Sequence, residues 1–135
     1  MKILFVCKHN RFRSKVAEAL FKQLNKNKRI KVSSAGLFEG NPISKNILNS
    51  AKRNNLTIIG KPRAMSDKLL KETDILVNVA ANVPSQVFKH HKNLKTISWN
   101  IKDLSSKEHY LQKTDKVVEK IRKKVENLIK KLPQN

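Results

Sequence analysis

The chain opens with four consecutive apolar residues, 3–6, which lead directly into its only cysteine, Cys7. A continuous apolar run is typical of a central parallel strand, because such a strand is covered on both faces. After a short polar loop, apolar residues recur at helical spacing between positions 16 and 24. A strand that leads through a loop into an amphipathic helix begins a β-α-β unit, so this stretch alone predicts a parallel sheet.

The same alternation of apolar runs and helical patterns continues along the chain. Three further apolar runs predict strands at 30–32, 75–80 and 94–99. Between these runs and after the last of them, helical patterns predict helices that begin after Ser44 and after Ser66 and helices at 84–88 and at about 106–132. We therefore expect an α/β fold, a three-layer α/β/α sandwich around a four-stranded parallel sheet, with residues 1–135 forming a single domain.

The net charge is the most extreme feature of the composition. The chain has 30 Lys and Arg against 10 Asp and Glu, which gives a formal net charge of +20 at pH 7. Such a charge favours anionic partners, among them nucleic acids and phosphorylated molecules. A nucleic acid is possible but not favoured, because the basic residues are spread along the chain and aromatic residues, which stack on bases, make up only 5%.

Cysteine and histidine are too sparse for a disulfide framework or a metal site. A single Cys excludes an intramolecular disulfide and any multi-cysteine zinc site. The four His show no metal-ligand spacing, since His90 and His91 are adjacent while His9 and His109 lie in unrelated segments. We therefore expect no metal and no cofactor. No apolar stretch approaches the roughly 18 residues of a membrane span, so no membrane contact and a cytoplasmic location are predicted.

The loop between the first strand and the first helix is the strongest candidate for a functional site. In doubly wound sheets, ligands bind beyond the carboxyl ends of the strands, near the point where the strand order reverses. Residues 7–14 would lie at such a point, beside a helix N-terminus whose N–H groups and dipole attract anions. Arg13 follows Cys7 by six positions, so the backbone between them can curl around a tetrahedral oxyanion while the guanidinium closes the ring.

Several motifs along the chain carry a resemblance to a known family. The pattern C-x-x-x-x-x-R-S near the amino terminus is joined by Asn10 within the loop, AEAL in the following helix, SAG at 34–36 and Asp103 after the fourth strand. Together these resemble the low-molecular-weight protein tyrosine phosphatases and the arsenate reductases that share their fold. The resemblance covers essentially the whole chain.

The resemblance implies a nucleophile, an anion-binding arginine and an acid. Cys7 would form a phosphocysteine intermediate, and Arg13 would bind the substrate oxygens and stabilise charge in the transition state. Asp103 would protonate the leaving oxygen and then activate water. Ser14 would hydrogen-bond the cysteine sulfur, and Asn10 would hold the loop in shape. The predicted substrate-binding residues are Lys8, His9, Asn10, Arg11, Phe12 and Ser14.

Simpler roles stay open for several of these residues. Cys7 on its own could be a small buried hydrophobic residue, and Ser14 could be only a helix cap. Asp103 could be a loop or capping residue. Asp115 is the rival acid, but it falls in the last helix, where we expect it to be solvated. Flanking charges such as Lys8 more often face solvent than a ligand.

The sequence departs from the family pattern at two places. His9 stands where the family usually has Gly, so the loop must accept a Cβ there. The family's acid is normally followed by Pro and by nearby aromatic residues, whereas Asp103 is followed by Leu, and no aromatic residue stands between Asp103 and Tyr110. Phe38 and Trp99 are the candidates for an aromatic wall of the cleft, although Trp99 also suits the core.

Three functions are compatible with these observations. The leading prediction is a cysteine-dependent phosphatase that hydrolyses phosphotyrosine proteins or small aryl phosphates, so its partner would be a phosphorylated protein or a small phosphomonoester. One alternative is an arsenate reductase, which would need an external thiol because the chain has no second cysteine. The other is a non-catalytic module that binds phosphate or nucleic acid.

Overall fold

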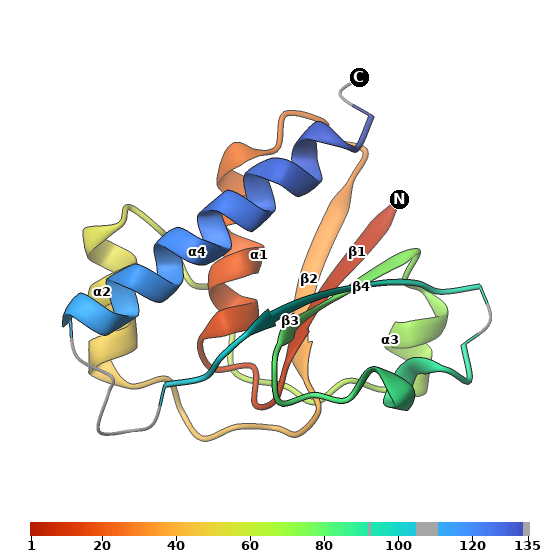
Figure 1. Cartoon of the computed structure of the whole chain (residues 1–135), viewed down its shortest axis with the longest axis horizontal. Helices are drawn as coiled ribbons and strands as arrows, with labels where there is room; N and C mark the ends of the chain where they lie inside the picture. Colours follow the sequence, from red (N-terminus) through yellow and green to blue (C-terminus); the bar gives the residue numbers. More distant parts are fainter. Residues whose placement is uncertain (92, 105–110, 134–135) are drawn as a thin grey trace.

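The computed structural model describes residues 1–91, 93–104 and 111–133. Its centre is a four-stranded parallel sheet with the strand order β2-β1-β3-β4 (Figure 1). The strands are β1 (Lys2–Cys7), β2 (Lys31–Gly36), β3 (Ile75–Ala80) and β4 (Lys95–Ile101). The helices are α1 (Arg13–Leu24), α2 (Lys45–Arg53), α3 (Asp67–Lys71), the 3-10 helix η1 (Ser85–Phe88) and α4 (Leu111–Lys130). The predicted α/β fold with four parallel strands is confirmed.

The side chains of β1 alternate between two hydrophobic cores, one on each face of the sheet. Ile3 and Phe5 are buried in a core that includes apolar residues of α1, α2 and α4. Leu4 and Val6 are buried in a second core, which includes residues of α3 and η1. Because successive side chains of a strand point to opposite faces, a strand covered on both sides must be apolar at every position. The unbroken apolar run at 3–6 is therefore a consequence of the three-layer architecture.

The sheet reverses its order beside β1. β2 pairs with one edge of β1, with Cys7 opposite Gly36, whereas β3 pairs with the other edge and carries β4 beyond it. The chain leaves β1 at Cys7 and enters α1 at Arg13, so the connecting loop lies at the switch point of the sheet. This is the position at which parallel α/β sheets bind ligands.

The long carboxyl-terminal helix α4 packs along α1 (Figure 1). Its apolar stripe at Val117, Val118, Ile121, Val125 and Leu128 is buried, as the helical spacing predicts. The predicted range was 106–132, and the helix is observed from Leu111 to Lys130; residues 106–110 lie outside the described part of the chain. Among the described residues, no helix is both long and apolar enough to cross a membrane.

The last strand is irregular near its carboxyl end. Ser98 pairs with Asn78, but Ile101 pairs with Ala80, so β4 contains one extra residue between these pairs. Asn100, which lies in this interval, adopts the left-handed region with a φ of 54°. An extra residue of this kind bends a strand and changes where the following side chains point. The strand consequently runs to Ile101 instead of ending at residue 99, and the turn towards Asp103 begins from this bend.

The two aromatic candidates for a cleft wall have different environments. Trp99 is only 8% exposed, and its ring centroid lies 5.7 Å from that of Phe5 in the core. Phe38 is 54% exposed, and its ring centroid lies 6.2 Å from that of His9 in the loop after β1. Of the two, Phe38 is thus the aromatic residue placed beside the loop, and Trp99 belongs to the core.

Candidate active site

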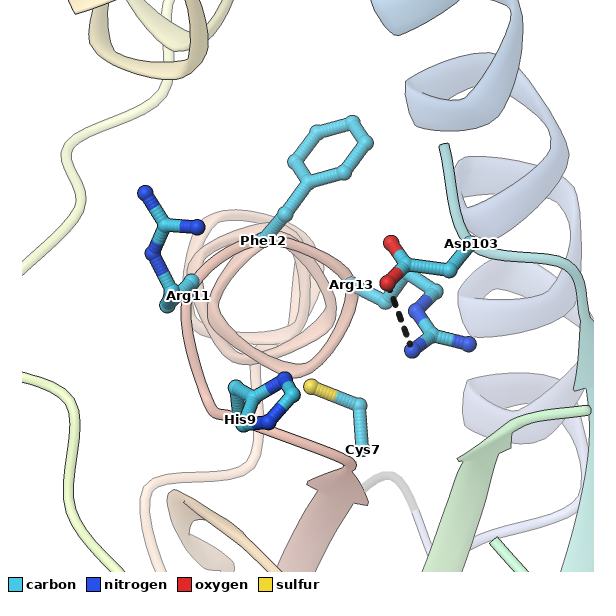
Figure 2. A pocket seen from close by; sticks show the side chains of 6 residues that line it. All are labelled: Cys7, His9, Arg11, Phe12, Arg13 and Asp103. Carbon is cyan, nitrogen blue, oxygen red and sulfur yellow. Dashed lines mark ion pairs between the residues drawn. The ribbon is translucent and has the colours of Figure 1, made fainter. Parts of the chain in front are cut away.

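A small pocket opens at the carboxyl end of β1, where residues 8–12 connect this strand to α1. Figure 2 shows the side chains that line it, which come from the loop, from the start of α1 and from the stretch after β4: Cys7, His9, Arg11, Phe12, Arg13 and Asp103. All six were predicted site residues. The remaining predicted residues Lys8, Asn10 and Ser14 are not among the lining residues. Asn10 and Ser14 instead form hydrogen bonds beneath the pocket, next to the Cys7 sulfur.

The sulfur of Cys7 is held by the hydroxyl of Ser14. Cys7 is 2% exposed, and its Sγ lies 2.9 Å from Ser14 Oγ. Asn10 Nδ2 donates to the same hydroxyl oxygen at 2.8 Å, so Ser14 already accepts one hydrogen bond and can direct its own proton to the sulfur. A donated hydrogen bond favours the thiolate, which is the nucleophilic form of cysteine.

Asn10 organises the loop through both its backbone and its side chain. Its φ of 55° lies in the left-handed region, which Asn adopts more readily than most residues. The side chain is fully buried, donates to Ser34 Oγ at 3.0 Å and accepts from the backbone N–H of Arg63 at 3.1 Å. Ser34 in turn donates to Glu18 Oε1 at 2.6 Å. The SAG segment belongs to the family resemblance, but no sequence pattern predicts that Ser34 supports the site.

The segment that follows β2 forms backbone hydrogen bonds with the beginning of the loop. Leu37 N–H donates to the Cys7 carbonyl and Phe38 N–H to the Lys8 carbonyl, each at 2.9 Å. A Cβ on Gly36 would lie 2.6 Å from the Phe38 carbonyl oxygen and 2.8 Å from the Asn10 amide nitrogen, closer than real contacts allow. Gly36 is therefore required for this close approach of two backbone segments.

Arg13 is buried at the start of α1 with its guanidinium fixed by three acceptors. It is 2% exposed, donates from Nη1 to the Ile101 carbonyl at 2.9 Å and from Nη2 to Asn82 Oδ1 at 3.0 Å. Asp103 Oδ2 lies 3.5 Å from Nη2, as the dashed line in Figure 2 marks. These contacts fix the plane of the fork beside Cys7. Asn82 was not foreseen, and nothing in its sequence context indicates a role.

The structure distinguishes between the two candidate acids. Asp103 follows β4, lines the pocket and has a 40% exposed side chain that points towards Arg13 (Figure 2). Asp115 is instead on α4, and its Oδ1 accepts hydrogen bonds from Ser50 and Arg53 of α2 and from Asn54, which directly follows α2. Of the two carboxyl groups, Asp103 is thus the one placed at the pocket.

Asp115 should contribute to stability and leave the pocket untouched. Although partial burial alone would raise its pKa, the hydrogen bonds from Ser50, Arg53 and Asn54 lower the pKa of Asp115 below its ordinary value of 3.8. We expect Asp115→Asn to reduce the free energy of unfolding by about 1 kcal/mol at neutral pH, a modest value because the group is partly exposed. A carboxyl group whose pKa is lower in the folded state stabilises the folded protein at pH values above its unfolded-state pKa. The difference in unfolding free energy between wild type and variant, measured by urea titration, should therefore vanish as the pH falls well below 3.8.

The other predicted loop residues occupy different surroundings. The guanidinium of Arg11 points away from the Cys7 sulfur (Figure 2), and its Nη2 donates to the Pro42 carbonyl at 2.9 Å. The Phe12 ring is 3% exposed and belongs to the core around α1. His9 lines the pocket, and because Asn10 is the loop residue with positive φ, the backbone accepts the Cβ of His9.

Positive charge accumulates at the N-terminus of α1. Its first turn contains Arg13 and Lys15 but no acidic residue. Lys15 is 5% exposed and donates from Nζ to the Ile59 carbonyl at 2.9 Å; burial lowers the pKa of Lys15, and the Glu18 carboxylate partly opposes this. Cations at a helix N-terminus are unfavourable unless an anion binds there. In the described part of the chain, no three His, Cys, Asp or Glu side chains group as a metal site.

A parallel α/β sheet whose central strand ends in a cysteine, followed by a loop that leads into a positively charged helix N-terminus, offers an anion a position beside the cysteine sulfur. Comparison with protein families identifies the group. The family model described as "Low molecular weight phosphotyrosine protein phosphatase" matches residues 2–135, and the chain belongs to this family. A search of curated proteins found no match to the sequence.

Similar solved structures include both phosphatases and arsenate reductases. An arsenate reductase from Archaeoglobus fulgidus is 26% identical, with a TM-score of 0.77 over 95% of this chain and 98% of that chain. A low molecular weight protein tyrosine phosphatase from T. tengcongensis is 24% identical, with a TM-score of 0.79 over 98% and 99%. An arginine phosphatase from Geobacillus stearothermophilus is 17% identical, with a TM-score of 0.80 over 96% and 91%. The fold is therefore common to enzymes that act on different substrates.

Proposed function

We propose that the protein is a cysteine-dependent phosphatase that hydrolyses phosphotyrosine in proteins or small aryl phosphates. One observation carries this proposal: Asp103 lines the same pocket as Cys7 and Arg13, although it lies far from both in the sequence. A sulfur nucleophile, a planar cation and a proton donor are the three parts that phosphoryl transfer to cysteine requires. The nucleophile must stay reduced, which suits action in the cytoplasm.

In the first step, the Cys7 thiolate attacks phosphorus. A sulfur–phosphorus bond forms while the bond from phosphorus to the leaving oxygen breaks, and the protonated Asp103 carboxyl group gives its proton to that oxygen. Arg13 binds two of the phosphoryl oxygens, and the unpaired N–H groups that a helix N-terminus provides can bind the third, so charge that develops there is stabilised.

In the second step, a water molecule replaces the cysteine. The Asp103 carboxylate removes a proton from this water, whose oxygen attacks phosphorus as the sulfur–phosphorus bond breaks. Inorganic phosphate leaves, the Cys7 thiolate is restored with help from the Ser14 hydroxyl at 2.9 Å, and Asp103 is protonated again. Acid and base are the same group, so each cycle begins and ends in the same protonation state.

The size of the pocket supports a phosphomonoester with its organic part outside. The cavity volume is about 30 Å³, which is far too small to enclose an aromatic ring. The organic part of the substrate must then rest on the surface around the pocket mouth. Phe38, exposed and beside His9, offers an aromatic face at that rim.

Arsenate reduction is the second candidate, favoured by the 26% identity with an arsenate reductase. Arsenate has the shape and charge of phosphate, so the same loop could bind it. Cys7 would displace water from arsenate to form a sulfur–arsenic bond, and an external thiol would then attack the sulfur. That attack would release arsenite and leave a mixed disulfide, because the chain has a single cysteine.

The proposal is tested by comparing how much the Asp103→Asn substitution slows the hydrolysis of substrates with different leaving groups. If Asp103 protonates the leaving oxygen, the variant should hydrolyse phenyl phosphate about 100-fold more slowly, since general acids typically contribute at least this much. The loss with p-nitrophenyl phosphate should be only a few-fold, because p-nitrophenolate departs with less help from an acid. Steady-state kcat values for both substrates give the comparison.

Asp115→Asn is the matched control, since it removes the same charge outside the pocket and should leave both rates near wild type. Equal losses with both substrates would indicate misfolding, and no loss with either would remove Asp103 from the mechanism. A wild-type protein that turns over neither substrate, yet reduces arsenate when an external thiol is supplied, would replace the phosphatase proposal with the reductase.

A further inference from the structure

A larger groove adjoins the catalytic pocket and shares Asp103 with it. One side of this β4–α4 groove is formed by residues 100–104, which cover the end of β4 and the segment that follows it. The other side is formed by Val117 and Lys120 of α4. Its volume is about 530 Å³, against about 30 Å³ for the catalytic pocket. Ligand sites usually measure roughly 300–1,000 Å³, so the groove has room for the part of a substrate that the catalytic pocket excludes.

The groove has an apolar floor and a basic rim. Ile101 and Val117 form part of its lining and are 7% and 8% exposed. Lys102 and Lys120 also line it, from two elements distant in the sequence, and both are exposed. Among the described lining residues the only acid is Asp103, which Arg13 faces at 3.5 Å. The potential along the groove is therefore positive, and it complements a carboxylate.

The irregularity in β4 directs the chain into this groove. The extra residue between the Ser98 and Ile101 pairs and the left-handed φ of 54° at Asn100 both precede Lys102 directly. Bulges next to active sites commonly re-aim side chains, and Lys102 and Asp103 follow this one at the point where β4 ends. The residue that reaches the catalytic pocket and the lysine at the groove rim are thus placed by the same backbone feature.

We infer that the β4–α4 groove binds an acidic peptide segment next to the phosphorylated residue, with Lys102 and Lys120 contacting carboxylate side chains. This inference rests on the proposed phosphatase function and specifies its substrate class. A peptide segment fits the groove better than a lone small anion, because the volume exceeds one anion and the apolar floor can bury side-chain stems. Phosphorylated sites flanked by Asp or Glu are then preferred over neutral ones.

The test compares two synthetic phosphotyrosine peptides that differ only in having Glu or Gln at the flanking positions. Wild-type protein should show a kcat/KM about fivefold higher for the Glu peptide, because two exposed ion pairs contribute modestly each. The preference should shrink in high salt, which screens exposed charges. In the double variant Lys102→Gln, Lys120→Gln, the ratio of the two kcat/KM values should fall to about one.

The matched control is the double variant Lys123→Gln, Lys124→Gln. It removes two exposed charges from the same helix outside the groove, so the wild-type ratio should persist. Equal rates for both peptides in wild type, a ratio that survives in the groove variant, or an equal loss of the ratio in the control would overturn the inference. So would a small bisphosphate that binds more tightly than the Glu peptide through Lys102 and Lys120.

Binding measurements separate this inference from the proposed function. The Cys7→Ser variant should bind the Glu peptide about fivefold more tightly than the Gln peptide, and this comparison requires no turnover. Hydrolysis of the Gln peptide by wild type with no preference for Glu would leave the phosphatase intact and reject the groove. Absence of hydrolysis with a Glu preference in binding would reject the phosphatase and retain the groove as an acidic-peptide site.

Discussion

Cys7→Ser should abolish phosphatase turnover while the protein stays folded and continues to bind phosphate. A serine hydroxyl fits the same space and can still meet Ser14 Oγ, which lies 2.9 Å from the sulfur in wild type. It is, however, almost never ionised at neutral pH, so it is a far weaker nucleophile than a thiolate. Removing a covalent nucleophile typically costs at least about 1,000-fold in kcat, and we expect a loss of that size with p-nitrophenyl phosphate.

Two controls make this result specific to the nucleophile. Urea unfolding curves of wild type and Cys7→Ser should agree within about 1 kcal/mol, since the change is small in volume. In wild type, iodoacetate should alkylate Cys7 and inactivate the enzyme, and inorganic phosphate should protect it because both occupy the same pocket. Turnover by Cys7→Ser within tenfold of wild type, or alkylation indifferent to phosphate, would contradict the assignment of Cys7.

Arg13→Lys should lower kcat/KM by about two orders of magnitude or more, equivalent to ~3 kcal/mol of transition-state stabilisation. The guanidinium is anchored by the Ile101 carbonyl at 2.9 Å and Asn82 Oδ1 at 3.0 Å, so its fork is held in one plane. A single ammonium keeps the charge but cannot hold these two acceptors and also bind two substrate oxygens. Because the charge is the same in both proteins, the loss in kcat/KM measures the contribution of the planar arrangement of hydrogen-bond donors.

The matched control for this substitution is Arg53→Lys on α2. Arg53 is 36% exposed and pairs with Asp115 at 2.8 Å, away from the pocket lining, so the same chemical change should leave kcat/KM near wild type. Because Arg13 is buried, the unfolding free energy of Arg13→Lys must be measured alongside the kinetics to separate instability from lost catalysis. A variant with kcat/KM within fivefold of wild type would mean that the loop does not enclose the phosphoryl group.

The loop after β1 illustrates what a local pattern can predict. An unbroken apolar run followed by amphipathic spacing defines a buried strand and a helix, and the loop between them must then lie at the carboxyl edge of a parallel sheet. Cys7 and Arg13 lie at the two ends of this loop, so their approach was predictable without any distant contact. The role of Asn82 was not predictable, because it reaches Arg13 across 69 residues of sequence and no motif surrounds it.

The acid shows where local pattern is insufficient. The family resemblance favours Asp103, which directly follows the last strand, over Asp115 in the last helix, but the adjacent residues do not show that the Asp103 carboxyl group reaches the pocket. The choice depends on the extra residue in β4, on the left-handed Asn100 and on the contact between α2 and α4 that engages Asp115. Each is a consequence of packing between elements distant in the chain.

The sequence by itself determined the order of strands and helices, the parallel sheet and the position of the loop between Cys7 and Arg13, because each depends on spacing within about 20 residues. The family resemblance was also readable from the sequence, as a set of short motifs along the chain. Tertiary structure alone decided that Asp103 faces Arg13 at 3.5 Å, that Trp99 belongs to the core, and that a basic groove adjoins the catalytic pocket. The physical reason is that periodicity fixes which face of an element is buried, whereas the neighbours that meet across that face are selected by the packing of the whole chain.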